Sequence, residues 1–273
     1  MKIAQTIKSL GKILLQSRSM SIPTCSKDGK SLIIMGNGPS LRNLLDEHIE
    51  LLKSMPTMAV NFAANTPSFF EIKPQFYTLA DPHFYEATTD ANVARLLENL
   101  RRVDWDMTLF VPRGASKIKS LLAGSNISIV FYNAVGIEGY SWLTDFTFNH
   151  RLGMPRPRNV LIPSIMIGSW MGFNNIYLAG ADHSWTKTLS VAPDNRVITN
   201  LPHFYNDDRQ ELKRIEAVYT NHHLHDLFLS YHIAFKAYHE IQAWAVKRGI
   251  NIYNITPDSF IDAFERRDVT KIV

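Results

Sequence analysis

The sequence has one cysteine, no long apolar run and no strong excess of charge of either sign. A lone Cys25 excludes an intrachain disulfide and a zinc site built from several cysteines, and it favours a cytosolic protein. No apolar run reaches the length that a bilayer-spanning helix requires. The net charge of +4 is compatible with an anionic ligand or an anionic membrane surface, but it selects neither.

Patterns typical of several protein classes are also missing. The chain holds no His-Glu-x-x-His motif and no Asp-x-Asp doublet, and Asp207-Asp208 is best interpreted as a solvated charge pair in a loop. We therefore predict no bound metal and no cofactor. Lysine and arginine are scattered and no recognition motif accompanies them, so we expect no binding to nucleic acid.

Short apolar runs alternate with helical patterns from Ser31 onward. The runs are too short for helices, and their near-continuous apolar character is typical of strands that are covered on both faces. We expect helices at 40–54, 91–104, 160–172 and 223–249, and a final helix that starts at Thr256. The pattern predicts an α/β fold with a doubly wound, mainly parallel sheet, in one domain over residues 31–273. The expected strands are SLIIMG, TMAVNF, QFYTLA, MTLFVP, ISIVFYN, NIYLAG and INIYNI.

Residues 1–20 have the spacing of an amphipathic helix, and residues 21–30 read as a linker. The apolar stripe of this helix consists of Ile3, Ile7, Leu10 and Leu14. Two interpretations stay open: the stripe packs on the domain's own surface, or residues 1–18 lie on an anionic membrane. We expect a cytoplasmic protein, either free or peripheral on the inner face of the membrane, and a homo-oligomer is a further option.

A long polar stretch interrupts the alternation between residues 183 and 219. Long irregular insertions in compact domains are usually lids or binding loops. This one holds many large rings for a simple linker, and we predict a lid. The rings include Trp185, His203, Phe204 and Tyr205.

The first predicted strand ends in Gly36-Asn37-Gly38-Pro39-Ser40 and a helical pattern follows at once. Glycine allows the backbone to come close to a ligand, and the free amides at the start of a helix attract anions. The turn is therefore a candidate seat for a nucleotide phosphate. It matches neither the P-loop nor the dinucleotide fingerprint, and the alternative is a plain tight turn.

Small polar residues follow other predicted strands at the same sheet edge. They are Asn61, Asp81, and the pair Asp182-His183. Ligands of doubly wound sheets bind beyond the carboxyl ends of the strands, so these residues are candidates for one shared site. Each is also a common cap or turn residue, and the two aspartates are alternatively acids that hold loops by accepting backbone N–H bonds.

Histidines are dense just after the predicted lid, at His222, His223 and His225, and Tyr219 precedes them. A histidine there is a candidate general base, because it titrates near neutral pH. The alternative is a helix cap with a surface cluster. We expect His232 and His239, deeper in the same helix, to pack inside.

The order of several blocks resembles glycosyltransferase family 42, bacterial sialyltransferases that use CMP-sialic acid to build surface glycans. The resemblance extends over most of residues 31–266. The opening Gly-x-Gly-Pro-Ser-Leu and the LxGxD strand also occur in a wider group that includes hydroxymethylpterin diphosphokinase-like proteins and flagellin-glycosylating motility factors. The blocks are IIMGNGPSL, Asn61, ADPHFYE, GFNNIYLAGAD and NIYNITPDSFIDAF.

The resemblance implies a Rossmann-like, GT-A-like fold and a metal-independent, inverting transfer. It implies that the donor is held by Gly36, Asn37, Gly38, Ser40, Asn61 and Asp81, with Arg158 and Asn159 near the place of the family's arginine and Thr-Ser pair. Only an arginine is kept there, and the Thr-Ser pair is absent. The family's Tyr-x-x-His element is matched by Tyr219 and His222, which makes His222 the general base. An ungapped count back from Pro257 selects His232 instead. The leaving phosphate would be met by His183 and Tyr205, because the family's tyrosines after LxGxD are missing.

The predicted function is therefore a glycosyltransferase of surface polysaccharide synthesis, lipopolysaccharide or capsule. Its partners would be a nucleotide-sugar donor, CMP-sialic acid or a related nonulosonate, and a glycan acceptor. Two alternatives remain. One is a diphosphokinase-like transferase that uses ATP and requires magnesium. The other is a non-catalytic relative that keeps the fold.

Overall fold

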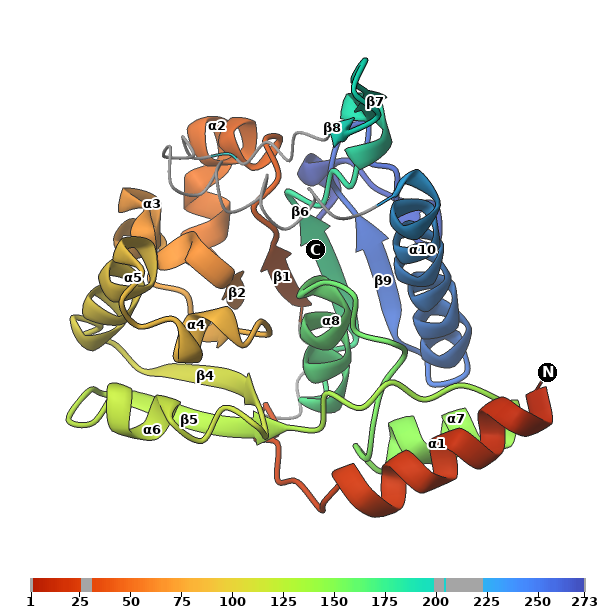
Figure 1. The fold of residues 1–273 in the computed structure, drawn as a ribbon. Coiled ribbons are helices and arrows are strands. Elements are labelled where there is room, and N and C mark those ends of the chain that lie inside the picture. Colours follow the sequence, from red (N-terminus) through yellow and green to blue (C-terminus); the bar gives the residue numbers. More distant parts are fainter. Residues whose placement is uncertain (1, 26–30, 199–203, 205–222, 273) are drawn as a thin grey trace.

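An eight-stranded sheet with helices on both faces forms the centre of the molecule (Figure 1). The structure is a computed structural model and describes residues 2–25, 31–198, 204 and 223–272. All seven strand pairings in this sheet are parallel, which makes the fold a Rossmann-like α/β fold, as predicted. The sheet order is β10-β9-β6-β1-β2-β3-β4-β5. The strands are β1 (Ser31–Met35), β2 (Thr57–Val60), β3 (Phe76–Thr78), β4 (Met107–Pro112), β5 (Ile127–Tyr132), β6 (Asn175–Ala179), β9 (Asn251–Asn254) and β10 (Glu265–Arg266).

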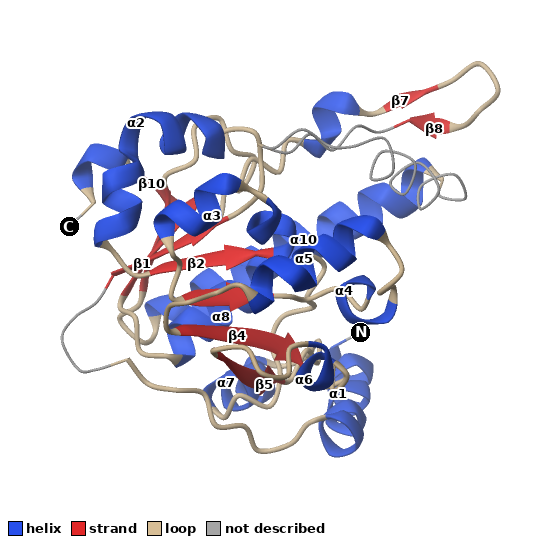
Figure 2. Cartoon of the chain, turned by 90° about the vertical axis from the view of Figure 1, so that its left-hand side faces the viewer, coloured by secondary structure: helices blue, strands red, loops and turns tan. Residues whose placement is uncertain are grey.

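The helices cover both faces of this sheet (Figure 2). On one face, α2, α3 and α5 bury apolar side chains against the sheet, and on the other face α8 and α10 do the same. The helices are α1 (Lys2–Gln16), α2 (Leu41–Ser54), α3 (Pro67–Ile72), α4 (His83–Glu86), α5 (Ala91–Arg101), α6 (Ile118–Leu121), α7 (Ser141–Asn149), α8 (Leu161–Trp170) and α10 (Leu224–Val246), with short 3-10 turns η1 (Asn61–Asn65), η2 (Trp185–Thr188) and η3 (Val269–Lys271). A small antiparallel hairpin, β7 (Ser190–Val191) and β8 (Val197–Ile198), stands apart from the sheet.

The chain reverses direction across the sheet at β1. It runs outward through β2, β3, β4 and β5, and then returns to place β6 on the other side of β1. Such a reversal is a topological switch point, where the connections leave in opposite directions from neighbouring strands. The carboxyl ends of β1 and β6 are therefore the place where a ligand site is expected.

All seven predicted strands are present, and so are the helices expected at 40–54, 91–104, 160–172 and 223–249. The final helix predicted at Thr256 is wrong. Thr256 Oγ1 donates to the Leu178 carbonyl at 3.1 Å and accepts from the Ala181 N–H at 3.0 Å. Ser259 Oγ donates to the Ala181 carbonyl at 2.6 Å. These residues fasten the loop after β9 to the end of β6, and their hydroxyls are used there instead of capping a helix.

The prediction that the histidines within α10 pack inside is wrong. His232 and His239 are exposed, and His239 Nε2 lies 3.1 Å from an Asp262 oxygen. Tyr231 and Tyr238, each one residue earlier, are buried instead. Neighbouring positions on a helix are about 100° apart, so the inward face passes through the tyrosines and not through the histidines.

The helix α1 forms as predicted, but its apolar stripe is not buried. Ile3, Ile7, Leu10 and Leu14 are all exposed, whereas Thr6 and Ser9 are buried against the domain. The expectation that the stripe packs on the domain's own surface is therefore wrong. Among the described residues, no helix is both long and apolar enough to span a membrane.

Candidate functional site

The loops after β1 and β6 are joined directly, backbone to backbone, at the switch point. The Gly36 N–H donates to the Ala179 carbonyl at 2.8 Å, and the Gly38 N–H donates to the Gly180 carbonyl at 2.9 Å. The sequence led us to expect that the amides of this turn are free to bind a phosphate. That expectation is wrong for Gly36 and Gly38, because their N–H groups are already bonded within the chain.

The glycines are required because the two loops approach so closely. A Cβ atom at Gly36 would lie 2.5 Å from the Gly180 carbonyl oxygen, and one at Gly38 would lie 2.7 Å from the same oxygen. Gly180 itself has φ +60°, a conformation that glycine adopts without strain. The glycine turn therefore serves first to bring two strand ends together.

The Asp182 side chain adds hydrogen bonds between the same two loops, both with Ser40. Ser40 Oγ donates to Asp182 Oδ2 at 2.8 Å, and the Ser40 N–H donates to Oδ1 at 3.3 Å. Burial raises the pKa of Asp182, and the two hydrogen bonds from Ser40 act in the opposite direction. The alternative in which Asp182 holds a loop by accepting a backbone N–H bond is confirmed.

Asn37 and Asn61 lie at the carboxyl ends of the adjacent strands β1 and β2. Asn37 Nδ2 donates to the Val60 carbonyl at 3.1 Å, which fixes its side chain across the gap between the strands. Asn61 has φ +51°, and its carbonyl accepts a hydrogen bond from the Tyr77 hydroxyl. Left-handed backbone at a non-glycine residue is uncommon and is frequently found at ligand sites.

Phe204, from the later part of the predicted lid, contacts this edge. The Phe204 N–H donates to the Asn37 carbonyl at 3.0 Å, and its ring is buried in the core on the α2 side. Arg42 donates to the Phe204 carbonyl. The insertion after β6 thus returns to the turn after β1, which is where a lid over the switch point would have to contact the domain.

The other side of the switch point carries a half-buried chain of hydrogen bonds. The Tyr238 hydroxyl donates to Asn159 Oδ1 at 2.9 Å and lies 2.7 Å from His183 Nε2. Asn159 Oδ1 also accepts from the Leu161 N–H at 3.0 Å. Asn159 and His183, both predicted from the sequence as site residues, are therefore joined through Tyr238, which sequence reasoning missed.

The His183 ring is enclosed by aromatic side chains. The centres of the His183 and Trp185 rings are 4.2 Å apart, and the Tyr238 ring lies at 5.5 Å. Burial lowers the pKa of His183 from its ordinary value of 6.5 to about 3, so the imidazole is neutral at physiological pH. Its backbone has φ +50°, so two left-handed residues, Asn61 and His183, follow strands on the two sides of β1.

Three buried side-chain atoms at these strand ends have no hydrogen-bond partner among the described residues. They are Asn37 Oδ1, Asn61 Oδ1 and Asn159 Nδ2. We call Asn37, Asn61, Asn159, Asp182 and His183 the switch-point site. Because α8 leads into β6, the α8 N-terminus and Asn159 lie at the edge where the strands end. The switch-point site therefore offers acceptors on its β1–β2 side and a donor beside a helix N-terminus on its β6 side.

Other predicted residues have local roles in the structure. Asp81 is exposed and its Oδ1 accepts from the His83 N–H at 2.8 Å, the loop-holding role that we considered as an alternative. Arg158 is exposed beside Asn159. His223 is the exposed N-cap of α10, and its N–H donates to Asp226 Oδ2 at 3.1 Å, which confirms the cap alternative for this histidine. The predicted residues His222, Tyr219 and Tyr205 lie outside the described part of the chain.

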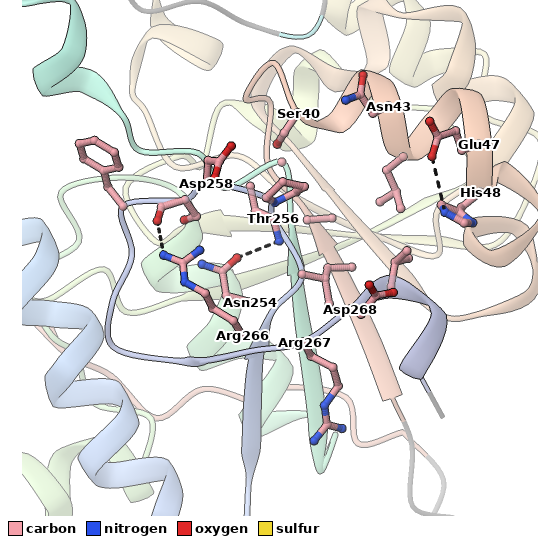
Figure 3. Close-up of a pocket in the computed structure, with 18 of the residues that line it drawn as sticks. Ser40, Asn43, Glu47, His48, Asn254, Thr256, Asp258, Arg266, Arg267 and Asp268 are labelled. Carbon is pink, nitrogen blue, oxygen red and sulfur yellow. Dashed lines mark hydrogen bonds and ion pairs between the residues drawn. The ribbon is translucent and has the colours of Figure 1, made fainter.

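A cavity of about 720 Å³ lies beside Ser40, Ala179 and Gly180, between α2 and the loop after β9 (Figure 3). Acidic groups line it together with basic ones. Both arginines at its rim are engaged, since Arg266 donates to the Ser259 carbonyl and Arg267 stacks 3.4 Å from the centre of the Tyr253 ring. In Figure 3 the Arg267 guanidinium points away from the cavity. The labelled lining residues are Ser40, Asn43, Glu47, His48, Asn254, Thr256, Asp258, Arg266, Arg267 and Asp268.

No group of three or more His, Cys, Asp or Glu side chains suited to a metal occurs within residues 2–25, 31–198, 204 and 223–272. The described polar groups of the switch-point site are amides, a neutral imidazole and a single carboxylate that Ser40 already occupies. Such groups bind through hydrogen bonds and suit an uncharged or anionic ligand.

The close approach of the two loops generates a first prediction. Gly36→Ala should lower the free energy of unfolding by about 2 kcal/mol or more, because the new methyl group meets a backbone oxygen that has no room to move. Urea unfolding of the ligand-free protein measures the effect. Gly114→Ala is the matched control, since its Cβ would meet no atom within 4 Å. Equal stability of the two variants would show that packing does not require Gly36.

The buried imidazole generates a second prediction, for pH. The native pKa of His183 lies below its unfolded value, so its contribution to stability is complete above pH 6.5 and declines as the pH falls from 6.5 toward 3. The slope is at most about 1.4 kcal/mol per pH unit. His183→Asn, which tolerates positive φ, should flatten the pH dependence of urea unfolding in this window. The exposed His232→Asn is the control, and equal pH dependence in both variants would contradict the assignment.

Comparisons with known proteins bear on the fold. No family model matches the sequence, and no curated protein does. Solved structures do match. A MAf glycosyltransferase from Magnetospirillum magneticum AMB-1 is similar over 100% of this chain and 39% of its own length, with 11% sequence identity and a TM-score of 0.53. At this identity the similarity establishes a shared fold, and the chain spans well under half of that larger protein.

Proposed function

We propose that the protein is a glycosyltransferase that binds the nucleotide part of an activated sugar at the switch-point site. The observation that carries the proposal is a set of three buried atoms without a hydrogen-bond partner in the described part of the chain, Asn37 Oδ1, Asn61 Oδ1 and Asn159 Nδ2. A buried polar atom without a partner costs about 1–3 kcal/mol, so a ligand that satisfies all three gains from each of them. The shared fold with a glycosyltransferase supports the reaction class.

A nucleotide sugar has the complementary groups. Its ribose and sugar hydroxyls donate hydrogen bonds, which Asn37 Oδ1 and Asn61 Oδ1 accept. Its phosphate oxygens accept hydrogen bonds and carry negative charge, which Asn159 Nδ2 and the positive end of the α8 helix dipole attract. In this arrangement the nucleotide lies across β1, with its hydroxyls toward β2 and its phosphate toward β6.

In the finer version of the proposal the donor is CMP-sialic acid or a related nonulosonate, and the transfer serves surface polysaccharide synthesis without a metal. His222, close before α10, takes the proton from the acceptor hydroxyl as that oxygen attacks the anomeric carbon. The bond from this carbon to the phosphate oxygen breaks, and the leaving nucleotide keeps the electron pair. Its charge is met at the α8 N-terminus by Asn159. His183 and Tyr205 are the further candidates for contact with the leaving group.

Ligand binding to Asn159→Asp tests the site. Aspartate keeps the Oδ1 atom that accepts from Tyr238 and Leu161, and it replaces only the donor with a negatively charged acceptor. We expect a nucleotide or nucleotide sugar from the panel CMP, CDP, UDP, GDP, ATP and CMP-sialic acid to stabilise the wild-type protein in a thermal-shift assay with EDTA present. Saturation a hundredfold above Kd adds about 2.7 kcal/mol. Asn159→Asp should weaken that binding about a hundredfold.

The control is Asn43→Asp, which makes the same chemical change in the cavity between α2 and the loop after β9. Weaker binding in this control, with normal binding by Asn159→Asp, would move the ligand to that cavity. A response to ATP that depends on magnesium would replace the proposal with the diphosphokinase-like alternative. A stable wild-type protein that binds none of the panel would favour the non-catalytic alternative.

The role of His222 has its own test. His222→Ala should lower the rate of sugar transfer by a factor of about 10²–10⁴, the usual contribution of a general base, and leave donor affinity unchanged. Transfer is measured with the donor identified in the thermal-shift screen. His225→Ala, an exposed neighbour on α10, is the matched control and should keep its activity. Full activity of the His222→Ala protein would remove this residue from the mechanism.

A further inference from the structure

The helix α1 is attached to the domain through its polar side. Ser9 Oγ donates to the Glu138 carbonyl at 2.8 Å and accepts from the Glu138 N–H at 2.9 Å, and Thr6 Oγ1 accepts from the Tyr140 N–H at 3.1 Å. Lys12 Nζ donates to the Gly136 carbonyl at 2.9 Å. A Cβ at Gly139 would lie 2.2 Å from Thr6 Oγ1, so this segment fits closely under the helix.

As a result, the apolar side of α1 faces away from the domain. Ile3, Ile7, Leu10 and Leu14, which we call the α1 stripe, lie on one face of the helix, and Ile7 is 65% exposed and Leu14 is 78% exposed. A surface helix normally turns this side toward its own core. The inverted attachment leaves a row of large aliphatic side chains in contact with water, which is unfavourable unless another apolar phase covers it.

The helix α7 adds aromatic side chains at the same end of the molecule. It follows the segment that α1 contacts, and it exposes Trp142 and Phe146, one helical turn apart. Figures 1 and 2 both show α1 and α7 near each other. Tryptophan is enriched where proteins meet the headgroup region of a bilayer.

The charge of residues 1–20 indicates what kind of surface covers the α1 stripe. Residues 1–20 contain the basic residues Lys2, Lys8, Lys12 and Arg18 and no acidic residue. The acidic groups of neighbouring elements have basic partners, since Asp145 lies 2.8 Å from Lys247 Nζ and Glu138 lies 4.0 Å from Arg156. Two copies that met stripe to stripe would bring the basic residues of both together, which is repulsive. An anionic surface attracts them.

We propose that the α1 stripe docks the protein on an anionic lipid bilayer, with α1 lying in the plane of the headgroups. The aliphatic side chains enter the boundary of the acyl region, and Lys2 and Lys8 contact lipid phosphates. Trp142 and Phe146 extend the contact. This surface is separate from the switch-point site, so lipid binding and nucleotide binding can be tested independently.

Sedimentation of the full chain with vesicles tests the docking. We expect binding to vesicles that contain phosphatidylglycerol, weaker binding to pure phosphatidylcholine, and a decrease of binding with added salt. Ile7→Ser combined with Leu14→Ser should reduce binding by about tenfold or more. The matched control is Val191→Ser with Ile198→Ser, which removes two exposed aliphatic side chains from the β7–β8 hairpin. Lys8→Glu should reduce binding roughly fivefold or more, and Lys117→Glu, just before α6, should not.

The results distinguish a lipid bilayer from a second copy of the chain as the partner of the α1 stripe. Equal binding to both vesicle types, or no binding to either, would overturn the proposal. So would a lipid-free oligomer, seen by analytical ultracentrifugation, that the stripe variants convert to a monomer, because the stripe would then be an interface between copies. Circular dichroism checks that the serine variants are folded. If they are not, the surface substitution Lys8→Glu decides between the outcomes.

Discussion

The backbone contact between the loops after β1 and β6 is the constraint on which the site depends. Gly36 and Gly38 donate to the end of β6, and Ser40 bonds to Asp182 just beyond it. This contact joins the ends of β1 and β6 and fixes the start of α2. It also holds Asn37 on one side and His183 on the other, so the positions of the site residues depend on it. The glycines act through the fold, and the proposed ligand contacts come from the residues that they position.

Much of the fold was predictable from the sequence because its strands are covered on both faces. Runs such as LIIM and IYLA are almost entirely apolar and end abruptly in glycine or polar residues, and their short length favours buried parallel strands over helices. The Thr256-Pro257-Asp258-Ser259 stretch has the local pattern of a helix start. Its hydroxyls are used in hydrogen bonds to Leu178 and Ala181, and a tertiary contact of this kind leaves no local signal.

The site was predictable in part because several of its residues directly follow predicted strands. Asn37, Asn61, Asp182 and His183 each follow a strand, so their place at the sheet edge could be derived from the alternation alone. Tyr238 lies in the middle of a helix that is apolar over much of its length, and a tyrosine beside a histidine gives no indication of which ring points inward. The chain of hydrogen bonds from Asn159 to His183 depends on the rotation of α10, which the tertiary packing decides.

The junction of Ser40 with Asp182 joins segments 142 residues apart. A contact between residues so far apart in the sequence closes a long loop of chain. It therefore forms only after the elements between the two residues have folded. During synthesis, a chain that has reached only the end of β5 has five of the eight strands but no partner for Gly36 and Gly38. The junction therefore cannot form before β6 has been synthesised, and the contacts of Asn159 and His183 with Tyr238 require α10 as well.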